Sequence, residues 1–399
     1  MAIDNKDKKI LNVPLLRFPE FSGEWEMVSL QDIATINPKS DPLQNTFIYI
    51  DLEAVEKGEL RKIQEIMREE APSRAQRVID NNDILFQCVR PYQKNNYIHR
   101  ILNTSNQQWV ASTGYAQIRT TELPNYIYHL LNTDEFNRKV MVRCTGSSYP
   151  AINSEDLATI HFYYTPDKKE QLKISRLLDL LDKRIATQNK IIEDLKKLKS
   201  AIIDYAINSL DTDFAKFGSL YETAGEGGTP TTSNASFYDN GKIPFVKIDD
   251  LKQKYLTENK DFITELGLQK SSAWLVPTRS ILFSNGATIG EITITTYPVC
   301  TKQGILGIVP KSNIDVEFLY YFMSSTYFKK AISRIVTEGT MKTAYLKDIA
   351  NILCPIPTKE KQQGIAKMPS ALNSKIDYEQ SLLKLFIMQK QYLLRQMFI

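Results

Sequence analysis

Residues 156–160, DLATI, recur 192 residues later as residues 348–352, DIANI. At the same offset, residues 126–131, YIYHLL, recur as residues 318–323, FLYYFM. Shorter matches have offsets of 190 and 197 residues, which indicates insertions or deletions in the loops between them. The chain is therefore predicted to contain two related domains that share a scaffold and differ in their loops, where function usually resides.

Each half combines strand and helix patterns. Short β-branched and aromatic runs bounded by Gly, Pro and Asn predict strands at residues 46–50, 290–296 and 304–309. Apolar residues at three- and four-residue spacing predict helices at residues 125–142 and 315–336. The globular parts are therefore predicted to be α+β.

A long helical pattern with heptad spacing ends each half. Positions three and four residues apart form one seam in the middle of the chain and one near its end: Ile185, Gln188, Ile192, Leu195, Lys199 and Ile202, and Ile376, Glu379, Leu383, Phe386, Lys390 and Leu393. Such spacing is typical of coiled coils. Because the two seams have the same length and the same order of apolar and polar positions, they are predicted to pair.

The polar seam positions predict the orientation of this pair. In a parallel pair, Lys199 would face Lys390 and the like charges would repel. An antiparallel pair can match Gln188 with Lys390 and Lys199 with Glu379. A shift of one heptad would set Gln188 and Glu379 against apolar residues, at about 1–3 kcal/mol for each unsatisfied group. We therefore expect the matched antiparallel register; the alternative is that each helix packs on its own domain.

These patterns divide the chain into four parts. They are a first globular domain at residues 1–166, a central spacer helix at 167–210, a second globular domain at 211–358 and a C-terminal spacer helix at 359–399. The expected fold is α+β, with the two domains related by pseudo-two-fold symmetry and separated by the helix pair.

Composition excludes several classes of protein. No window reaches the 18 or so apolar residues of a membrane helix, and residues 1–10 precede no apolar stretch of signal-peptide length, so a cytoplasmic location is expected. The four cysteines are far apart and there are only three histidines, so no metal site, disulfide framework or cofactor is predicted. The net charge of +4 decides nothing about nucleic acid, because a sequence reader needs only local basic patches.

Catalytic motifs are not found in the sequence. There is no Asn/Asp-Pro-Pro-aromatic motif for adenine methylation, no GxxxxGK[ST] phosphate loop and no HExxH. The carboxylate pairs Asp249-Asp250 and Asp80/Asp83 are interpreted as turn and surface residues. The chain is therefore predicted to have no catalytic site.

Several motifs resemble one family over essentially the whole chain. Residues 225–230, GEGGTP, and 240–251, NGKIPFVKIDDL, resemble the opening signature of the target-recognition domain of type I restriction–modification specificity subunits. Residues 17–21, RFPEF, resemble the N-terminal lead-in of this family, and residues 283–290, FSNGATIG, and 301–305, TKQGI, resemble its mid-domain motifs. The first half departs from the pattern, because it lacks GGTP near Asn37 and has Gln87-Cys88-Val89-Arg90 in place of the Gly-rich turn.

The resemblance implies a non-catalytic subunit that recognises a bipartite, asymmetric site on double-stranded DNA. It implies a complex with two methyltransferase subunits that methylate adenine, and with restriction subunits when the complex also cleaves. Helices of about 40 residues are about 60 Å long, on the order of one to two turns of B-DNA. The alternatives are a coiled-coil scaffold with two protein-binding domains and an enzyme with an unrecognised active site.

Polar side chains beside Gly and Ser turns are the candidates for DNA contact. Arg, Lys, Asn and Gln can reach base edges, whereas Tyr, Ser and Thr hold phosphates. In the first domain the predicted residues are Arg90, Tyr92, Lys94, Asn95, Ser147, Ser148 and Tyr149. In the second domain they are Ser284, Asn285, Lys302, Gln303, Lys342 and Thr343, with Thr340 and Met341 beside them.

Overall fold

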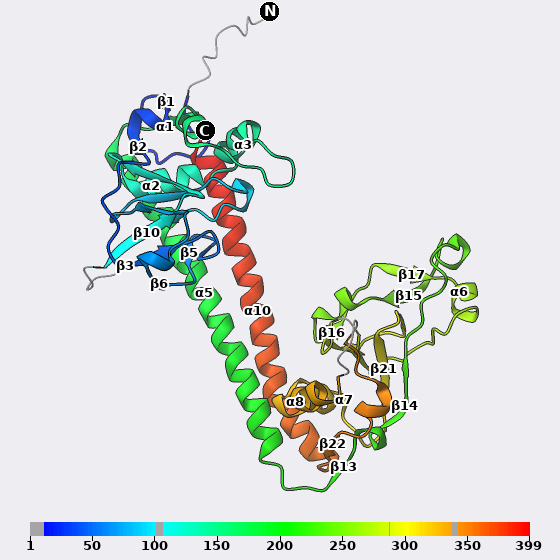
Figure 1. Ribbon diagram of the computed structural model, residues 1–399. Coiled ribbons are helices and arrows are strands. Elements are labelled where there is room, and N and C mark those ends of the chain that lie inside the picture. Colours follow the sequence, from blue (N-terminus) through cyan, green and yellow to red (C-terminus); the bar gives the residue numbers. More distant parts are fainter. Residues whose placement is uncertain (1–11, 101–106, 287, 337–341) are drawn as a thin grey trace, which may run out of the picture. The chain divides into compact units, whose positions relative to one another are not determined.

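The computed structural model describes residues 12–100, 107–286, 288–336 and 342–399 (Figure 1). The chain forms two compact units. Unit 1 comprises Met1–Asn189 and Leu382–Ile399, and unit 2 comprises Lys190–Ser381. Each unit holds one globular domain together with one end of each of two long helices, α5 (Lys168–Asn208) and α10 (Lys359–Met397).

The globular part of unit 1 mixes short strands and helices. Its elements are β1 (Glu26–Ser29), α1 (Leu30–Ile33), β2 (Ala34–Ile36), β3 (Thr46–Ile50), β4 (Val55–Glu56), β5 (Glu59–Leu60), β6 (Gln64–Met67), η1 (Arg68–Glu70), β7 (Ala75–Val78), β8 (Ile84–Gln87), η2 (Pro91–Gln93), β9 (Tyr97–Ile98), β10 (Gln108–Ser112), β11 (Tyr115–Thr120), α2 (Pro124–Leu131), α3 (Asp134–Arg143), α4 (Ser154–Ala158) and β12 (His161–Tyr164). The strands form sheets ordered β6-β3-β10-β7 and β2-β11-β8-β9, with β1 paired to β12 and β4 to β5.

The globular part of unit 2 repeats this plan. Its elements are β13 (Phe214–Lys216), η3 (Phe217–Ser219), β14 (Tyr221–Glu226), η4 (Ala235–Phe237), β15 (Ile243–Val246), η5 (Ile248–Lys252), β16 (Tyr255–Leu256), β17 (Asp261–Ile263), α6 (Glu265–Gln269), β18 (Ile281–Ser284), β19 (Ile292–Thr295), β20 (Cys300–Thr301), β21 (Ile305–Pro310), α7 (Val316–Ser324), α8 (Thr326–Ile335), α9 (Leu346–Ile349) and β22 (Leu353–Pro355). The strands form sheets ordered β14-β21-β18-β19-β16 and β17-β15-β20, with β13 paired to β22.

Strand pairing confirms the internal repeat. The order β2-β11-β8-β9 in unit 1 corresponds to β14-β21-β18-β19 in unit 2, and β6-β3-β10 corresponds to β17-β15-β20. The one parallel pairing in each of the latter sheets also recurs, as β3 with β10 and as β15 with β20. The strands predicted at residues 46–50, 290–296 and 304–309 are β3, β19 and β21. Both globular parts are α+β.

The helices predicted at residues 125–142 and 315–336 are each two helices, so the prediction of a single helix was wrong. The Thr133 hydroxyl accepts a hydrogen bond from the Phe136 N–H and starts α3, and the Ser325 hydroxyl accepts one from the Phe328 N–H and starts α8. Short hydroxyl side chains at such a cap satisfy N–H groups that the helix leaves unpaired. The apolar spacing continues across the break, which hid it in the sequence.

An aromatic cluster joins the end of the chain to the core of unit 1. The ring of Phe398 lies 6.1 Å from that of Trp25 and 5.4 Å from that of Tyr126, and all three side chains are buried. The red end of α10 accordingly lies beside the first elements of unit 1 (Figure 1). Because aromatic side chains bury large apolar areas, this cluster fixes the end of α10 on the first domain.

The two long helices run antiparallel in unit 1, but the predicted register is wrong. Lys390 pairs with Asp182, and the Arg184 guanidinium lies 4.4 Å from the centre of the Phe386 ring, so the numbering rises along α5 as it falls along α10. The predicted partner of Lys390 was Gln188, about one heptad away.

Unit 2 shows the same displacement. Lys199 Nζ donates to Asn373 Oδ1 at 2.9 Å, whereas Glu379 was the predicted partner. Lys199 to Asn373 and Lys390 to Asp182 are repeat-equivalent contacts, because both residues of one pair are offset by 191 from those of the other. The prediction failed because it considered only seam positions, whereas Asp182 and Asn373 lie beside the seam.

Reversing charges at this contact tests the register. Asp182→Lys is expected to lower the free energy of unfolding by about 1 kcal/mol, because it sets two cations together at a half-buried site. Adding Lys390→Glu should restore most of the loss. Urea unfolding of the single and double variants measures this coupling. Gln188→Lys should show no coupling with residue 390. Coupling of residue 390 with Gln188 and not with Asp182 would restore the predicted register.

A buried polar bridge holds each domain on a long helix. In unit 1, His129 Nε2 lies 2.8 Å from Asp179 Oδ1. Burial of Asp179 acts to raise its pKa, but hydrogen bonds from His129 and Asn125 outweigh burial and hold the pKa below its ordinary value. In unit 2 the repeat-equivalent Tyr321 donates to Ser370 Oγ at 3.1 Å. The polar contact lies at equivalent positions of the two repeats, but it joins different residue types, His with Asp in one and Tyr with Ser in the other.

Asp83 is buried, so its interpretation as a surface residue was wrong. Its side chain is 1% exposed and accepts two hydrogen bonds from Arg119, at 2.8 and 2.7 Å. Gln117 Nε2 and the Asp80 N–H also donate to it, both at 2.7 Å. The carboxylate therefore ties β8 to β11.

Within the described ranges, no helix combines the length and apolar character needed to cross a membrane.

Candidate DNA interface

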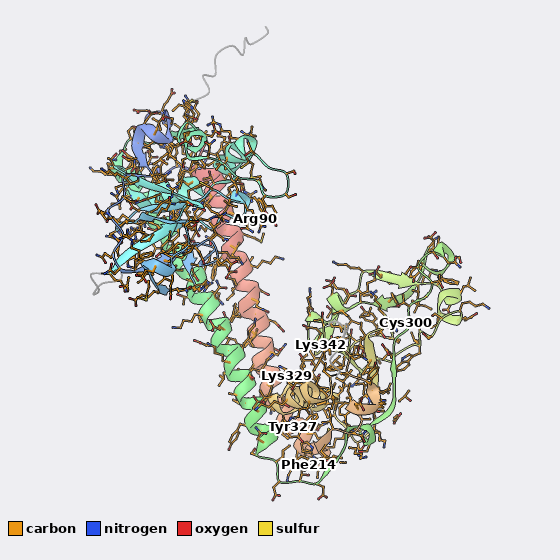
Figure 2. The ribbon with its side chains drawn as sticks, viewed as in Figure 1. Arg90, Phe214, Cys300, Tyr327, Lys329 and Lys342 are labelled. Atoms are coloured by element: carbon orange, nitrogen blue, oxygen red, sulfur yellow. The ribbon has the colours of Figure 1, made fainter. Side chains whose placement is uncertain are left out.

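Two of the predicted loops meet in unit 1. Val89 forms a bridge with Ala151, and the Arg90 N–H donates to the Pro150 carbonyl at 2.8 Å. The Arg90 guanidinium (Figure 2) lies over the ring of Tyr149, 4.3 Å from its centre. The structure thus brings together the candidate residues that the sequence placed about 60 positions apart.

The remaining candidates of unit 1 fall into two groups. Tyr92 and Tyr149 are 50% and 63% exposed, and Ser147 and Ser148 are also exposed. Lys94 is engaged within the unit, because its Nζ donates to Asp134 Oδ1 at 2.7 Å and to the Asn132 carbonyl at 3.1 Å.

Asn95 supports a neighbouring turn, since its Oδ1 accepts from the Lys57 N–H at 3.0 Å. Lys94 and Asn95 therefore hold their loop in place. The candidate side chains of the two loops that remain available to a ligand are Arg90, Tyr92, Ser147, Ser148 and Tyr149.

Ser284 and Asn285 in unit 2 are buried, at 0% and 1% exposure. Ser284 Oγ donates to the Thr288 carbonyl and accepts from the Glu291 N–H, which closes the Gly-rich turn. Asn285 Nδ2 donates to the Ala344 carbonyl at 3.2 Å. Both residues shape loops, and neither side chain faces solvent.

The GEGGTP motif supports the loop that carries Lys302 and Gln303. The Gln303 N–H donates to Thr229 Oγ1 at 3.3 Å, and the Gly304 N–H donates to Glu226 Oε1 at 3.0 Å. A Cβ on Gly227 would lie 2.3 Å from the Thr301 carbonyl oxygen, so only glycine allows this close approach. Lys302 and Gln303 themselves are exposed. The family resemblance identified this motif in the sequence. Its role in supporting the loop of Lys302 and Gln303 was not predicted.

Glu226 offers a test of that role. Glu226→Ala is expected to weaken DNA binding by about 1 kcal/mol, roughly fivefold, because the Gly304 N–H loses its acceptor and the loop loosens. Glu226→Gln keeps an acceptor oxygen at the same place and should bind within about twofold of wild type. Fluorescence anisotropy with labelled duplex measures both variants. Equal losses in the two variants would attribute the effect to the charge instead.

Lys342 is exposed, and Thr343 is half-buried and follows it directly. Thr340 and Met341 lie outside the described residues. Lys342 and Lys329 (Figure 2) border a mostly apolar cavity of about 330 Å³ with Phe283, Ile289 and Ile332. Lys329 was not singled out from the sequence, although the adjacent pair Lys329-Lys330 on α8 was a signal.

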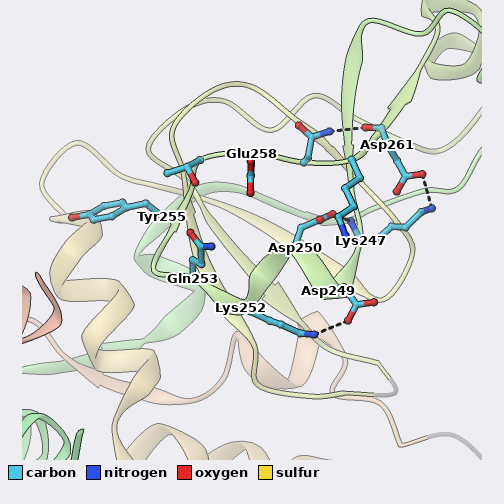
Figure 3. A pocket seen from close by; sticks show the side chains of 11 residues that line it. Lys247, Asp249, Asp250, Lys252, Gln253, Tyr255, Glu258 and Asp261 are labelled. Atoms are coloured by element: carbon cyan, nitrogen blue, oxygen red, sulfur yellow. Dashed lines mark hydrogen bonds and ion pairs between the residues drawn. The ribbon is translucent and has the colours of Figure 1, made fainter. Parts of the chain in front are cut away.

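A larger cavity, of about 480 Å³, lies in unit 2 around η5 and β17 (Figure 3). Two of its lysines pair with carboxylates: Lys247 lies 2.8 Å from Asp261, and Lys252 lies 3.0 Å from Asp249. The cavity adjoins the predicted loop that carries Lys302, because the Lys302 N–H donates to the carbonyl of Val246, the residue before Lys247, at 2.9 Å.

The described residues contain no group of three or more His, Cys, Asp or Glu side chains placed to hold a metal ion. The four cysteines are free, and burial raises the pKa of Cys88 to about 12 and that of Cys300 to about 11. These thiols stay protonated at neutral pH and are poor nucleophiles.

The seam residues of the helix pair are all buried or half-buried. They are Ile185, Gln188, Ile192, Leu195, Lys199, Ile202, Ile376, Glu379, Leu383, Phe386, Lys390 and Leu393. Burial lowers the pKa of Lys199.

Comparison with known proteins gives one consistent result. A model of the type I restriction modification DNA specificity domain matches the chain twice, at residues 22–197 and 211–385. The HindI specificity subunit of Haemophilus influenzae is 22% identical, over 80% of this chain and 83% of that protein.

Two solved structures share the fold. A chain of a type I restriction–modification system has a TM-score of 0.59 at 19% identity and covers 93% of this chain and 96% of its own length. The S subunit from M. genitalium has a TM-score of 0.57 at 15% identity, over 97% of this chain and 99% of its own. The resemblance seen in the sequence motifs is confirmed. The chain belongs to the family of type I restriction–modification DNA specificity subunits.

Proposed function

We propose that this chain binds double-stranded DNA at a bipartite, asymmetric sequence, with one half-site read by each domain. The observation that carries this proposal is the duplicated scaffold with unlike loops. The loop of unit 1 presents Arg90 and Tyr149, whereas the loops of unit 2 present Lys302, Gln303 and Lys342. Different donors and acceptors on the same scaffold select different bases.

The domain division is part of the proposal. Residues 1–166 and 211–358 are the target-recognition domains, and residues 167–210 and 359–399 are the spacer helices between them. Such a spacer would set the distance between the two half-sites.

The chain is also proposed to position two adenine-methyltransferase subunits, and restriction subunits when the complex cleaves. The catalytic chemistry then resides in these partners. One surface in unit 1 supports protein assembly: Leu385, Met388 and Tyr392 on α10 are 58%, 54% and 59% exposed, at spacings of three and four residues. This is the pattern of a helix face that receives another helix.

Binding and methylation assays test the proposal. The chain purified with its methyltransferase partner should bind duplex DNA with an affinity that falls steeply with salt, and more tightly than the chain alone. Sequencing of methylated adenines in cells that carry both proteins should reveal one split sequence. A scaffold that binds only proteins would show neither salt-dependent DNA binding nor a single methylated motif.

A further inference from the structure

Equivalent loops of the two domains are held by different means. In unit 1, the Cys88 N–H donates to the Gly114 carbonyl at 3.0 Å, and the Ile152 N–H donates to the Cys88 carbonyl at 3.1 Å. The main-chain ladder then continues through the bridge of Val89 with Ala151 and the bond from Arg90 to Pro150. Backbone pairing therefore positions residues 150–152, next to Tyr149.

In unit 2 the same ladder starts at Asn285. The Asn285 N–H donates to the Gly304 carbonyl at 3.0 Å, and the Ala344 N–H donates to the Asn285 carbonyl at 2.9 Å, as in the first repeat. Ser284 closes the Gly-rich turn through its contacts with Thr288 and Glu291. A side chain adds to this pairing, since Asn285 Nδ2 donates to the Ala344 carbonyl at 3.2 Å.

Asn285 thus joins three loops. Its backbone holds Gly304, which follows Lys302 and Gln303, and its carbonyl and amide together hold Ala344, which follows Lys342 and Thr343. Ala344 is fully buried and has no polar side chain. Cys88 occupies the equivalent position of the first repeat. It has no side-chain amide, and there the contact to Ile152 is made by the main chain.

We propose that Asn285 is a positioning residue of the second target-recognition domain, whose side-chain amide sets the place of Lys342 and Thr343 relative to Lys302 and Gln303. This inference rests on the proposed function and deepens it. Asn285 itself does not contact DNA in this scheme; it acts through the loops that do.

One feature of Asn285 separates positioning from stability. Its Oδ1 is buried and accepts no hydrogen bond from the described residues. Asn285→Ala removes this unsatisfied acceptor but takes the side-chain donor from the Ala344 carbonyl, and these two effects on folding oppose each other. The variant should unfold at nearly the wild-type midpoint while the loop loses its anchor.

The experiment uses the complex with the methyltransferase partner and duplexes in which each base pair of the split site is changed in turn. Asn285→Ala is expected to lower discrimination about tenfold within one half-site and to leave the other half-site within about twofold. Asn285→Cys, which copies the first repeat, should show the same loss, because the thiol cannot replace the amide. Cys88→Ala is the matched control and should leave discrimination unchanged at both half-sites.

Each outcome separates the two claims. If the wild-type complex does not discriminate between duplexes, the proposed function fails. If it discriminates and Asn285→Ala is unchanged at every position, or weakens all duplexes alike, the positioning role is overturned. Should Asn285→Ala fold poorly, Asn285→Cys and Asn285→Ser carry the test, and an unchanged pattern in both would also overturn it.

Discussion

Replacing Arg90 by alanine is expected to reduce discrimination at one position of the first half-site by about 1–3 kcal/mol, roughly five- to 150-fold. The guanidinium is planar and presents paired donors that suit the O6 and N7 acceptors of guanine. Its stacking on Tyr149 fixes its orientation before DNA arrives, which lowers the entropy lost on binding. A panel of single-base-pair duplexes, assayed by competition, measures the effect.

Two further variants separate base reading from charge. Arg90→Lys keeps the positive charge but loses the planar pair of donors, so specificity should fall nearly as far as in Arg90→Ala. Tyr149→Phe keeps the ring under the guanidinium and should bind like wild type, whereas Tyr149→Ala should show part of the loss. If Arg90→Ala weakens every duplex equally, Arg90 contacts phosphate; if binding is untouched, the interface is elsewhere.

The repeat made much of the fold predictable. Matches such as residues 156–160 with 348–352 come from buried elements whose apolar side chains tolerate little change. Leu157 and Ile349, for example, are both fully buried. Because core packing constrains these positions and not the loops, the sequence retained the shared scaffold and its two long helices.

The interface was predictable only in part, and for a physical reason. Arg90 and Tyr149 could be proposed as chemically suitable residues, but their contact depends on the bridge of Val89 with Ala151, a long-range pairing with no local signal. Ser284 and Asn285 looked like base-reading residues because they flank a glycine. Their burial depends on Gly304 and Ala344, which approach from elsewhere in the chain.

The prediction of the helix register failed for a similar reason. Matching the seam residues alone favoured Lys199 opposite Glu379. Lysine has a long, flexible side chain, so it can reach acceptors beside the seam, and Asp182 and Asn373 provide them one heptad away. Register in a short coil is therefore set by flanking polar residues as well as by the apolar core.

Loss of the Asp83 carboxylate is expected to have the largest effect on stability. Asp83→Ala should lower the free energy of unfolding of unit 1 by about 3 kcal/mol, because it removes the shared acceptor of Arg119, Gln117 and the Asp80 N–H from a buried site. Arg119 keeps its contact with Asp80, at 2.5 Å, and is 41% exposed, which limits the penalty. Denaturant unfolding combined with hydrogen exchange of unit 1 amides measures it.

The second repeat supplies the matched control for this prediction. At the positions equivalent to Asp83 and Arg119, unit 2 has Ser280 and Val309, so the same pair of strands, β18 and β21, folds without an ion pair. The double variant Asp83→Ser, Arg119→Val should therefore lose less than about half of what Asp83→Ala loses, because no charge is left unpaired. If the double variant is as unstable as the single one, the cost arises from Gln117 and the Asp80 turn; if Asp83→Ala costs under about 1 kcal/mol, the buried carboxylate does not hold β8 to β11.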